Sequence, residues 1–408
     1  MTDSVFITRV VLKNYKSIGK CSVRLGPLNF LVGPNGAGKS NFMDALRFLR
    51  DSLSTSLDHA LQERGGIGEV RRRPLGRHAR PTHFGVRLEF KLPDSRFGWY
   101  AFRIGAKLES GFDVQQEECH LFGPKALEKK FFQIKSGKVI DSNPRVALPA
   151  VSDRFYLVVA ASLPEFRGLY DALSRMGFYN LNPDEIRELQ NPDPGEVLRR
   201  DGSNLASVLR VMEKNRPDSR KQVVEFLSKV VPGVKSVATK ALGKKETLEF
   251  RRTIGERKYS WRFPAESMSD GTLRALGVLT ALYQSSNGGS RRVPLVGIEE
   301  PEMAVHPGAA GVLRDALISA SAATQVIVTS HSPDLLDDKS VSDDWIISVV
   351  NLNGETMIAP IEQADRNAIR DRLYTAGELL RQGQLSPDLE ESERTTPRQL
   401  ELFVEMES

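Results

Sequence analysis

The stretch Leu31-Val32-Gly33-Pro34-Asn35-Gly36-Ala37-Gly38-Lys39-Ser40 has the pattern G-x-x-x-x-G-K-[ST] of a phosphate-binding loop. Its glycines allow successive backbone N–H groups to surround an anion. Lys39 is expected to reach the β- and γ-phosphates of ATP, and the Ser40 hydroxyl to bind Mg²⁺. Apolar residues 28–32 predict a strand before the loop, and residues 41–49 predict a helix whose N-terminus faces the phosphates. The residues expected to contact ATP are Gly33, Pro34, Asn35, Gly36, Ala37, Gly38, Lys39, Ser40 and Asn41.

The composition is that of a soluble globular protein. Charged residues make up 27% of the 408 residues and hydrophobic residues 40%, and no apolar run approaches the roughly 18 residues of a membrane span. The first residues do not resemble a signal peptide, and the two cysteines, Cys21 and Cys119, lack metal-ligand spacing. These features predict a cytoplasmic protein with free thiols and no membrane association.

The chain divides into three expected regions, all within an α/β fold. Residues 1–150 contain the phosphate loop and a series of alternating apolar and polar stretches from 84 to 140, typical of an antiparallel β meander. Residues 151–233 have apolar residues at helical spacing, which predicts a compact helical insertion that ends at Pro232-Gly233. Residues 234–408 begin with three short strands and continue with further strand and helix patterns, which we assign to the C-terminal half of the same lobe.

A basic segment lies between the first helix and the meander. No acidic residue occurs between Glu69 and Glu89, so this segment has no local neutralisation. A solvated charge run and a phosphate-binding surface, for nucleotide or nucleic acid, are nearly equal alternatives here. A docking site for an acidic partner subunit is a third. The nucleic-acid or partner candidates are Arg71, Arg72 and Arg73, within a cluster that also contains Arg64, Arg77, His78, Arg80 and His83.

Three distal motifs carry further polar groups. Ser269, Asp270 and Gly271 open a helix, where a hydroxyl and free N–H groups can meet an anion, although an ordinary helix cap has the same pattern. The buried strand 293–298 ends in Glu299-Glu300-Pro301-Glu302, and the strand 325–329 ends in Ser330-His331. One carboxylate at a strand end can hold Mg²⁺ and the next can polarise a water molecule.

In this order the motifs resemble those of ATP-binding-cassette ATPases of the RecF/SMC/OLD-like branch, over roughly residues 5–385. The resemblance includes the element Asn14-Tyr15-Lys16-Ser17. It implies a P-loop head in which Glu299 is the Mg²⁺-associated Walker B residue, Glu300 the catalytic base and His331 the switch histidine. It also implies that Ser269, Asp270 and Gly271 contact nucleotide bound to a second protomer. The active unit would be a homodimer or higher oligomer with ATP between the heads.

The chain departs from the family pattern in several places. Glu299 stands where the family usually has Asp, and the signature reads Met-Ser-Asp-Gly-Thr. For the Q-loop glutamine, Gln115 and Gln116 are the candidates. OLD nucleases have a TOPRIM domain after the ATPase, for which the residues after His331 are too few. We therefore expect a nuclease effector to be a separate chain.

The function expected from the sequence is an ATPase that acts on or senses nucleic acid together with an effector, in anti-phage defence or DNA repair. A transporter-type nucleotide-binding subunit is disfavoured by the signature and by the insertion. A slow, ATP-dependent structural clamp is the remaining alternative.

Overall fold

The centre of the molecule is a mostly parallel sheet of six strands, in the order β16-β15-β3-β14-β13-β9. The computed structural model describes residues 5–74, 80–107, 111–123, 129–145, 149–253, 260–285, 292–303, 305–390 and 401–403. All neighbouring strands of this sheet are parallel except β15 and β16. The strands are β3 (Leu28–Val32), β9 (Gly177–Tyr179), β13 (Leu295–Glu299), β14 (Gln325–Ser330), β15 (Ile346–Leu352) and β16 (Glu355–Pro360).

A second sheet of seven antiparallel strands confirms the predicted meander and extends it. The N-terminal hairpin joins it because β1 pairs with β4, giving the order β2-β1-β4-β5-β6-β7-β8. The strands are β1 (Phe6–Tyr15), β2 (Ile18–Arg24), β4 (His83–Lys91), β5 (Phe97–Ala106), β6 (Phe112–Phe122), β7 (Lys129–Lys135) and β8 (Lys138–Asn143).

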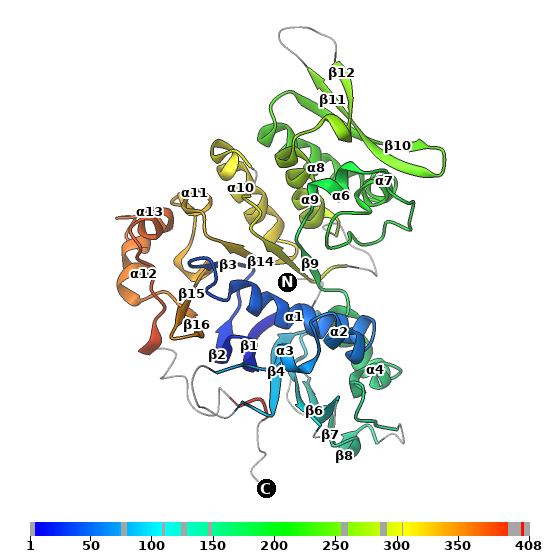
Figure 1. Ribbon diagram of the computed structural model, residues 1–408, viewed down its shortest axis with the longest axis vertical. Helices are drawn as coiled ribbons and strands as arrows, with labels where there is room; N and C mark the ends of the chain where they lie inside the picture. Colours follow the sequence, from blue (N-terminus) through cyan, green and yellow to red (C-terminus); the bar gives the residue numbers. More distant parts are fainter. Residues whose placement is uncertain are drawn as a thin grey trace.

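The helices lie around these sheets, and a third sheet of three antiparallel strands projects at one end of the molecule (Figure 1). Its strands are β10 (Val234–Leu242), β11 (Lys245–Thr253) and β12 (Ser260–Pro264). The α-helices are α1 (Lys39–Ser54), α2 (Leu57–Gln62), α3 (Ile67–Val70), α4 (Tyr156–Ala160), α5 (Pro164–Leu173), α6 (Pro183–Arg187), α7 (Leu205–Asn215), α8 (Pro217–Val230), α9 (Asp270–Tyr283), α10 (Ala310–Ser321), α11 (Pro333–Leu336), α12 (Gln363–Arg370) and α13 (Ala376–Arg381). None of the described helices has both the length and the apolar run needed to cross a bilayer.

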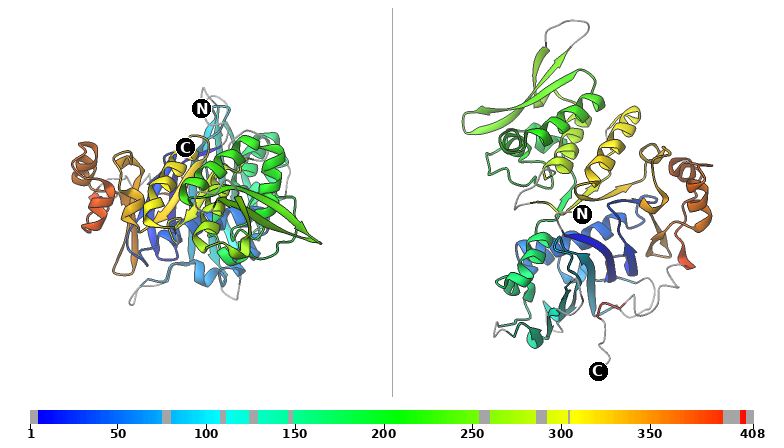
Figure 2. Two further views of the ribbon diagram at one scale, coloured as in Figure 1. Left: turned by 90° about the horizontal axis from the view of Figure 1, so that it is seen from above. Right: turned by 180° about the vertical axis from the view of Figure 1, so that it is seen from behind.

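The parallel sheet separates two hydrophobic cores. On one face, Leu31 and Ile327 pack with α1 and the antiparallel sheet. On the other face, Phe30 and Val328 pack with helices α7 to α10. The alternation of side chains along a strand explains why neighbouring residues of β3 enter different cores. Figure 2 shows the resulting arrangement, with the two groups of elements on opposite sides of the sheet.

The helical pattern expected between Ala150 and Val231 is interrupted by strand β9. This three-residue strand pairs with β13 at the edge of the parallel sheet, with Tyr179 opposite Ile298. The helices before and after it pack in different cores, α4 and α5 with the antiparallel sheet and α7 and α8 on the other side. A strand of three residues is too short to produce a periodic signal, so the sequence pattern missed it. The division of the chain at residues 150 and 233 stays a prediction.

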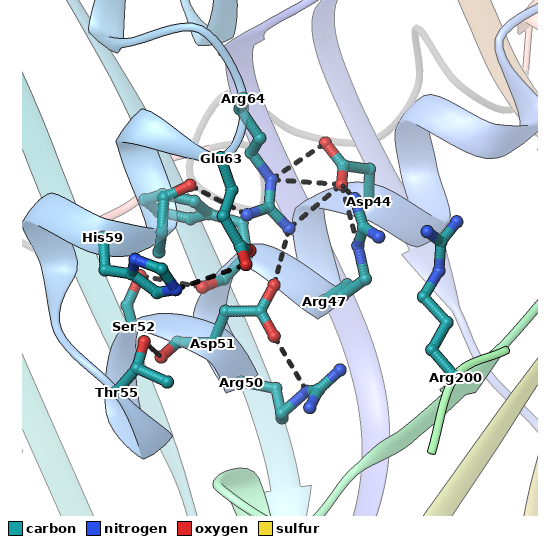
Figure 3. Close-up of polar contacts among 12 residues, drawn as sticks. Asp44, Arg47, Arg50, Asp51, Ser52, Thr55, His59, Glu63, Arg64 and Arg200 are labelled. Atoms are coloured by element: carbon teal, nitrogen blue, oxygen red, sulfur yellow. Dashed lines mark hydrogen bonds and ion pairs between the residues drawn. The ribbon is translucent and has the colours of Figure 1, made fainter. Parts of the chain in front are cut away.

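A buried ionic cluster ties α1 to its surroundings (Figure 3). Arg64 lies between two carboxylates of α1, donating to Asp44 at 3.1 Å and to Asp51 at 2.9 Å. Arg47 and Lys16 also contact Asp44, at 2.6 and 2.5 Å. Burial alone would favour the protonated carboxyl, but Arg64, Lys16 and Arg47 together hold the pKa of Asp44 well below its usual range. The cluster therefore joins α1 to the turn between β1 and β2 and to the segment after α2.

A buried carboxylate joins β6 to α4. Glu117 accepts hydrogen bonds from the backbone N–H groups of Tyr156 and Leu157, at 2.5 and 2.9 Å, and from the Tyr100 hydroxyl at 2.9 Å. Burial raises the pKa of Glu117 to about 7, although these three donors oppose the shift. The folded protein therefore binds a proton at Glu117 at a pH where the unfolded chain has lost it.

This shift predicts a pH dependence of stability. Glu117 has a raised pKa in the folded protein, so its contribution is most favourable below the unfolded pKa of about 4.3 and is lost as the pH rises towards 7. Glu117→Gln retains an acceptor and cannot ionise. We compare the free energy of unfolding of the variant with that of wild type. As the pH rises from 5 to 8, this difference should move in favour of the variant by up to roughly 3 kcal/mol, because only wild type loses the contribution of Glu117. Urea unfolding of both proteins at the two pH values measures this difference, and identical pH profiles would contradict it.

Candidate active site

The predicted phosphate-binding and catalytic residues meet at one edge of the parallel sheet. Strands β3, β14 and β13 are adjacent and parallel, with Val32 opposite Ser330 and Thr329 opposite Glu299. Each of the three strands thus ends at the same level, and the polar residues that follow them gather there. In open α/β sheets ligands bind in the crevice beyond the carboxyl ends of the strands.

The glycines of the phosphate loop fit against strands β15 and β16. A Cβ on Gly33 would overlap the carbonyl oxygen of Val349, and a Cβ on Gly38 would overlap the side chain of Thr356. Gly38 also has a φ of 108°, which disfavours any side chain. Gly36 has a φ of 77°, but a Cβ there would meet no atom within 4 Å. The requirement for glycine at 33 and 38 is therefore partly tertiary, because distant strands pack against the loop.

Thr356 fixes the loop by hydrogen bonds as well as by packing. Its hydroxyl, fully buried on β16, donates to the carbonyl oxygen of Ala37 at 2.8 Å. Since that uses the only hydroxyl proton of Thr356, the 2.6 Å contact with Ser17 has Ser17 as donor. Asn41 in turn donates to the Ser17 hydroxyl at 2.6 Å. The Asn14-Tyr15-Lys16-Ser17 element and the loop thus form one network, and no local motif in the sequence indicated Thr356.

Lys39 lies against the loop from which it comes. Its ammonium group donates to the carbonyl oxygens of Gly33 and Pro34, at 2.7 and 3.0 Å. Burial lowers the pKa of Lys39, and the nearby carboxylates of Glu300 and Glu302 oppose that shift. These carbonyl contacts place the charge of Lys39 inside the curve of the loop, where phosphate oxygens are expected to bind.

Glu300 and His331 face one another across the ends of β13 and β14. The Glu300 carboxylate lies 3.5 Å from Nδ1 of His331, and both side chains are partly exposed. Glu300 has a left-handed backbone with φ of 45°, while its N–H donates to the carbonyl oxygen of Thr329 at 3.0 Å. A non-glycine residue in that conformation is strained, and such strain concentrates at functional sites. Here it directs the carboxylate away from the strand and towards His331.

Glu302 is a second carboxylate at this edge. One of its oxygens accepts from the Ser330 hydroxyl at 2.6 Å and from the His331 N–H at 3.3 Å. The other oxygen is buried and has no hydrogen-bond partner among the described residues. Glu302 therefore holds the backbone at His331 in place and also presents an unsatisfied acceptor beside the phosphate loop.

Ser40 and Glu299 line the same small cavity, of about 140 Å³. Oxygen ligands of this type suit Mg²⁺. No group of three or more His, Cys, Asp or Glu side chains in the described residues could hold a metal on its own. The donor set therefore fits an ion that takes its remaining ligands from nucleotide phosphates and water, as Mg²⁺ usually does.

Two arginines that the sequence did not single out contact the Glu299–Glu300 segment. Arg200 donates to the Glu299 carboxylate at 3.2 Å, and it reaches this position because the N–H of Asn180, just after β9, donates to the Arg200 carbonyl oxygen. Figure 3 shows Arg200 near Arg47, on the side of α1 that lines the cavity. Arg274 of α9 lies 3.4 Å from the carbonyl oxygens of both Glu299 and Glu300. Neither residue has a local sequence signature, because each meets the Glu299–Glu300 segment only in the fold.

The signature residues lie apart from this cavity. Ser269 caps α9 and its hydroxyl is 2.9 Å from that of Thr272, while Asp270 pairs with Arg187 of α6. Ser269 and Asp270 are exposed, with Gly271 half-buried, and none of the three lines the cavity around Ser40. Their role as contacts to a second protomer's nucleotide stays a prediction.

The arginines of the basic segment are engaged within the chain. Arg71 donates to the carbonyl oxygen of Pro81 at 3.0 Å, Arg72 to Glu355 at 2.6 Å, and Arg73 pairs with Glu69. Arg77 and His78 lie outside the described residues. A contact of Arg71–Arg73 with nucleic acid or a partner stays a prediction. All three guanidinium groups therefore already have a partner within the chain.

The Q-loop candidates lie in the antiparallel sheet and not at the ends of the parallel strands. Gln115 and Gln116 belong to β6 of the antiparallel sheet. The chain segment beside Glu299 is the end of β9, since Tyr179 pairs with Ile298, the residue before Glu299. The sequence missed this placement because it missed strand β9.

Comparison with known proteins agrees with this geometry. A family model described as "AAA domain, putative AbiEii toxin, Type IV TA system" matches residues 28–337. An OLD nuclease of Thermus scotoductus is 24% identical over 336 residues, which are 81% of this chain and 60% of that protein. The chain therefore spans less than two thirds of that relative.

Solved structures of SMC heads have the same fold. An SMC head bound to the C-terminal winged-helix domain of ScpA matches with a TM-score of 0.54 and 15% identity, over 88% of this chain and 99% of that one. An SMC head with an extended coiled coil from Pyrococcus furiosus, bound to the C-terminal domain of ScpA, matches with a TM-score of 0.50 and 12% identity, over 90% of this chain and 99% of that one. At these identities the likeness concerns the fold.

Replacing Thr356 tests whether β16 holds the phosphate loop. Thr356→Val keeps the side-chain volume but leaves the Ala37 carbonyl and the Ser17 hydroxyl without their partner, which should cost about 1–3 kcal/mol of stability. We also expect weaker binding of ATP, by about 3- to 10-fold, because the loop loses a fixed point. Thr356→Ser retains the hydroxyl and is the matched control. Thermal unfolding and titration with a fluorescent ATP analogue measure both effects, and equal behaviour of the two variants would contradict this role.

Proposed function

Because this chain belongs to the AAA_21 family of ATPases, within the SMC/RecF/OLD-like branch, we propose that it hydrolyses ATP with Glu300 as the base. The observation that carries this proposal is the convergence of the phosphate loop, Glu300 and His331 at the ends of adjacent parallel strands. A helix N-terminus and a lysine supply positive charge on one side, and carboxylates supply a base on the other.

The proposed mechanism assigns one task to each residue. Lys39 and the loop N–H groups bind the phosphates and stabilise charge that develops on them. Ser40 and Glu299 would hold Mg²⁺, which would supply positive charge that stabilises the phosphates. Glu300 orients a water molecule towards the γ-phosphate and accepts its proton, while His331, 3.5 Å away, stabilises the carboxylate and contacts the γ-phosphate side.

The same proposal includes an ATP-dependent homodimer. The exposed Ser269 and Asp270 at the start of α9 are available to a second molecule. Arg274, one turn further along α9, contacts the backbone of Glu299 and Glu300. Binding of a second molecule's nucleotide at Ser269 and Asp270 would therefore act through α9 on the position of Glu300 in the same protomer.

We further propose that the ATPase acts on or senses nucleic acid together with a separate effector. The matched relative is named a nuclease, and the matched SMC heads were solved with ScpA domains bound. For this chain a nuclease effector and a role in anti-phage defence or DNA repair are extensions of that likeness. The transporter-type subunit has no supporting observation. A slow structural clamp would use the same residues and is distinguished by its turnover rate.

Replacing the proposed base separates binding from chemistry. Glu300→Gln keeps the size of the side chain but cannot accept a proton, so hydrolysis should fall by about 10²-fold or more while ATP still binds. Glu302→Gln is the matched control, since it lies two residues away and contacts the same strand end. Steady-state phosphate release and ATP titration measure the two effects. Normal turnover in Glu300→Gln, with a large loss in Glu302→Gln, would transfer the role of base to Glu302.

Mixing two inactive variants tests the shared site. Lys39→Ala removes the cation that the phosphates need, and Ser269→Arg blocks the signature, so each homodimer should be inactive. A mixed dimer contains one intact composite site and one doubly damaged site, and some hydrolysis should return on mixing. The size of the oligomer with and without ATP is measured in parallel. An unchanged size in wild type and in Glu300→Gln would contradict the ATP-dependent dimer.

A further inference from the structure

The three-stranded sheet holds an unusual share of the positive charge. Its described residues, 234–253 and 260–264, include seven lysines and arginines and two glutamates, a net charge of +5. This equals the formal net charge of all 408 residues. The remainder of the protein is therefore close to neutral, and this sheet is a region of net positive charge that attracts a polyanion.

One face of this sheet is buried and the other faces solvent. Val237, Leu248 and Phe250 belong to the core with α7 and α8. Because side chains alternate along a strand, the residues between them point outward. The outward residues include four cations, which we name the basic face: Lys240, Lys245, Arg251 and Arg262. Ser236, Arg251 and Arg262 form one row across the sheet.

The basic face has more positive charge than its own carboxylate can balance. On the described strands, Glu249 is the one acidic residue that points outward, and it lies 3.5 Å from Lys240 and 3.7 Å from Arg262. Arg251 and Lys245 have no ion-pair partner among the described residues. The side chains of Lys240 and Arg262 remain 55% and 65% exposed. By contrast, Arg72 and Arg73 of the basic segment each pair with a glutamate.

An exposed aromatic ring lies on the edge strand of the same sheet. Trp261 of β12 is 53% exposed and stands opposite Arg252 on β11, so it points to the face that contains Phe250 and not to the basic face. A ligand on the basic face reaches this ring around the free edge of β12. A flexible single strand can follow that path and stack an unpaired base on the ring while the cations contact its phosphates, which suits nucleic acid better than an acidic protein.

We infer that the basic face binds the phosphate backbone of nucleic acid, with Trp261 stacking on an unpaired base at the sheet edge. This inference rests on the proposed action on nucleic acid and gives it a location. The chain leaves β12 at Pro264 and reaches Ser269 after the single 3₁₀ turn Ala265–Ser267, which contacts β11 and β12. A ligand on this sheet therefore lies directly before the signature in the chain, and its binding should change the ATPase rate.

The test compares two variants with the same loss of charge. Lys240→Gln/Arg251→Gln/Arg262→Gln removes three cations from the basic face. Lys20→Gln/Lys91→Gln/Lys135→Gln removes three exposed cations from the antiparallel sheet and is the matched control. Binding of a labelled oligonucleotide of about 30 nucleotides, single-stranded or duplex, is measured by anisotropy between about 50 and 200 mM salt. Circular dichroism and basal ATPase activity confirm that both variants fold.

We expect the basic-face variant to bind the oligonucleotide about tenfold or more weakly than wild type. The slope of log affinity against log salt concentration should become shallower by about 2–3, because each phosphate contact that is lost no longer releases a counterion on binding. The control should bind as wild type does. Stimulation of ATPase activity by the oligonucleotide should be lost with the basic face. Trp261→Ala should weaken the single strand more than the duplex and remove the quenching of tryptophan fluorescence on binding.

Four outcomes would overturn the inference, and they differ from one another. Equal losses in the basic-face and control variants would show that total charge matters and position does not. Competition by polyglutamate as strong as that by DNA would assign the face to an acidic protein. If the basic-face variant binds nucleic acid as tightly as wild type does, the interface lies elsewhere in the protein, and the proposed function still stands. A wild-type protein that binds no nucleic acid would remove that part of the proposed function as well.

Discussion

The close packing of the phosphate loop against strands β15 and β16 is the constraint on which the site depends. Gly33 and Gly38 leave no room for a Cβ because the Val349 carbonyl and the Thr356 side chain occupy that space. Thr356 also donates to the carbonyl oxygen of Ala37, 319 residues earlier in the chain. A loop of this composition would be flexible by itself, since glycine loses the most backbone entropy on folding. The strands behind it select one conformation, and α1 and Lys39 then lie in fixed positions.

The chemistry follows from the way the parallel sheet collects charge at one edge. Glu299, Glu300 and Glu302 come from the end of a single strand, and cations from other elements face them. Arg200 contacts the Glu299 carboxylate, and Arg274 approaches the backbone of both Glu299 and Glu300. Lys39 comes from the loop beside them. Because the acidic and basic groups belong to separate segments, nucleotide phosphates entering between them can change contacts in several segments at once. Arg274 belongs to α9, so these contacts also join the end of β13 to the helix that begins at the signature.

Much of the architecture was predictable because its signals are local. The strand–loop–helix unit, the antiparallel meander and the strands that end at Glu299 and Ser330 all follow from periodicity and from residue types within about ten positions. The resemblance implied that Lys39, Ser40 and Glu300 serve one ATP site, and the fold shows that the strands before them end at the same edge of the sheet. Strand β9 was missed because three residues carry no period, so the sequence did not show that Tyr179 lies beside Ile298. Gln115 and Gln116 lie in β6, and their role as Q-loop residues stays a prediction. The conformation of Glu300, with φ of 45°, also has no signature in its sequence.

The sequence by itself determined the nucleotide-binding chemistry, because the spacing of glycine, lysine and serine around residues 33–40 suits phosphate and little else. Only the tertiary structure decided which distant groups serve that chemistry: Thr356 behind the loop, Arg200 and Arg274 beside the carboxylates, and the partners that occupy Arg72 and Arg73. It also decided where unbalanced charge remains, on the outward face of β10–β12. The reason is physical: a motif fixes backbone and side-chain types over a few residues, whereas ion pairs and close packing join segments hundreds of residues apart. Which charges are neutralised is settled only when those segments meet.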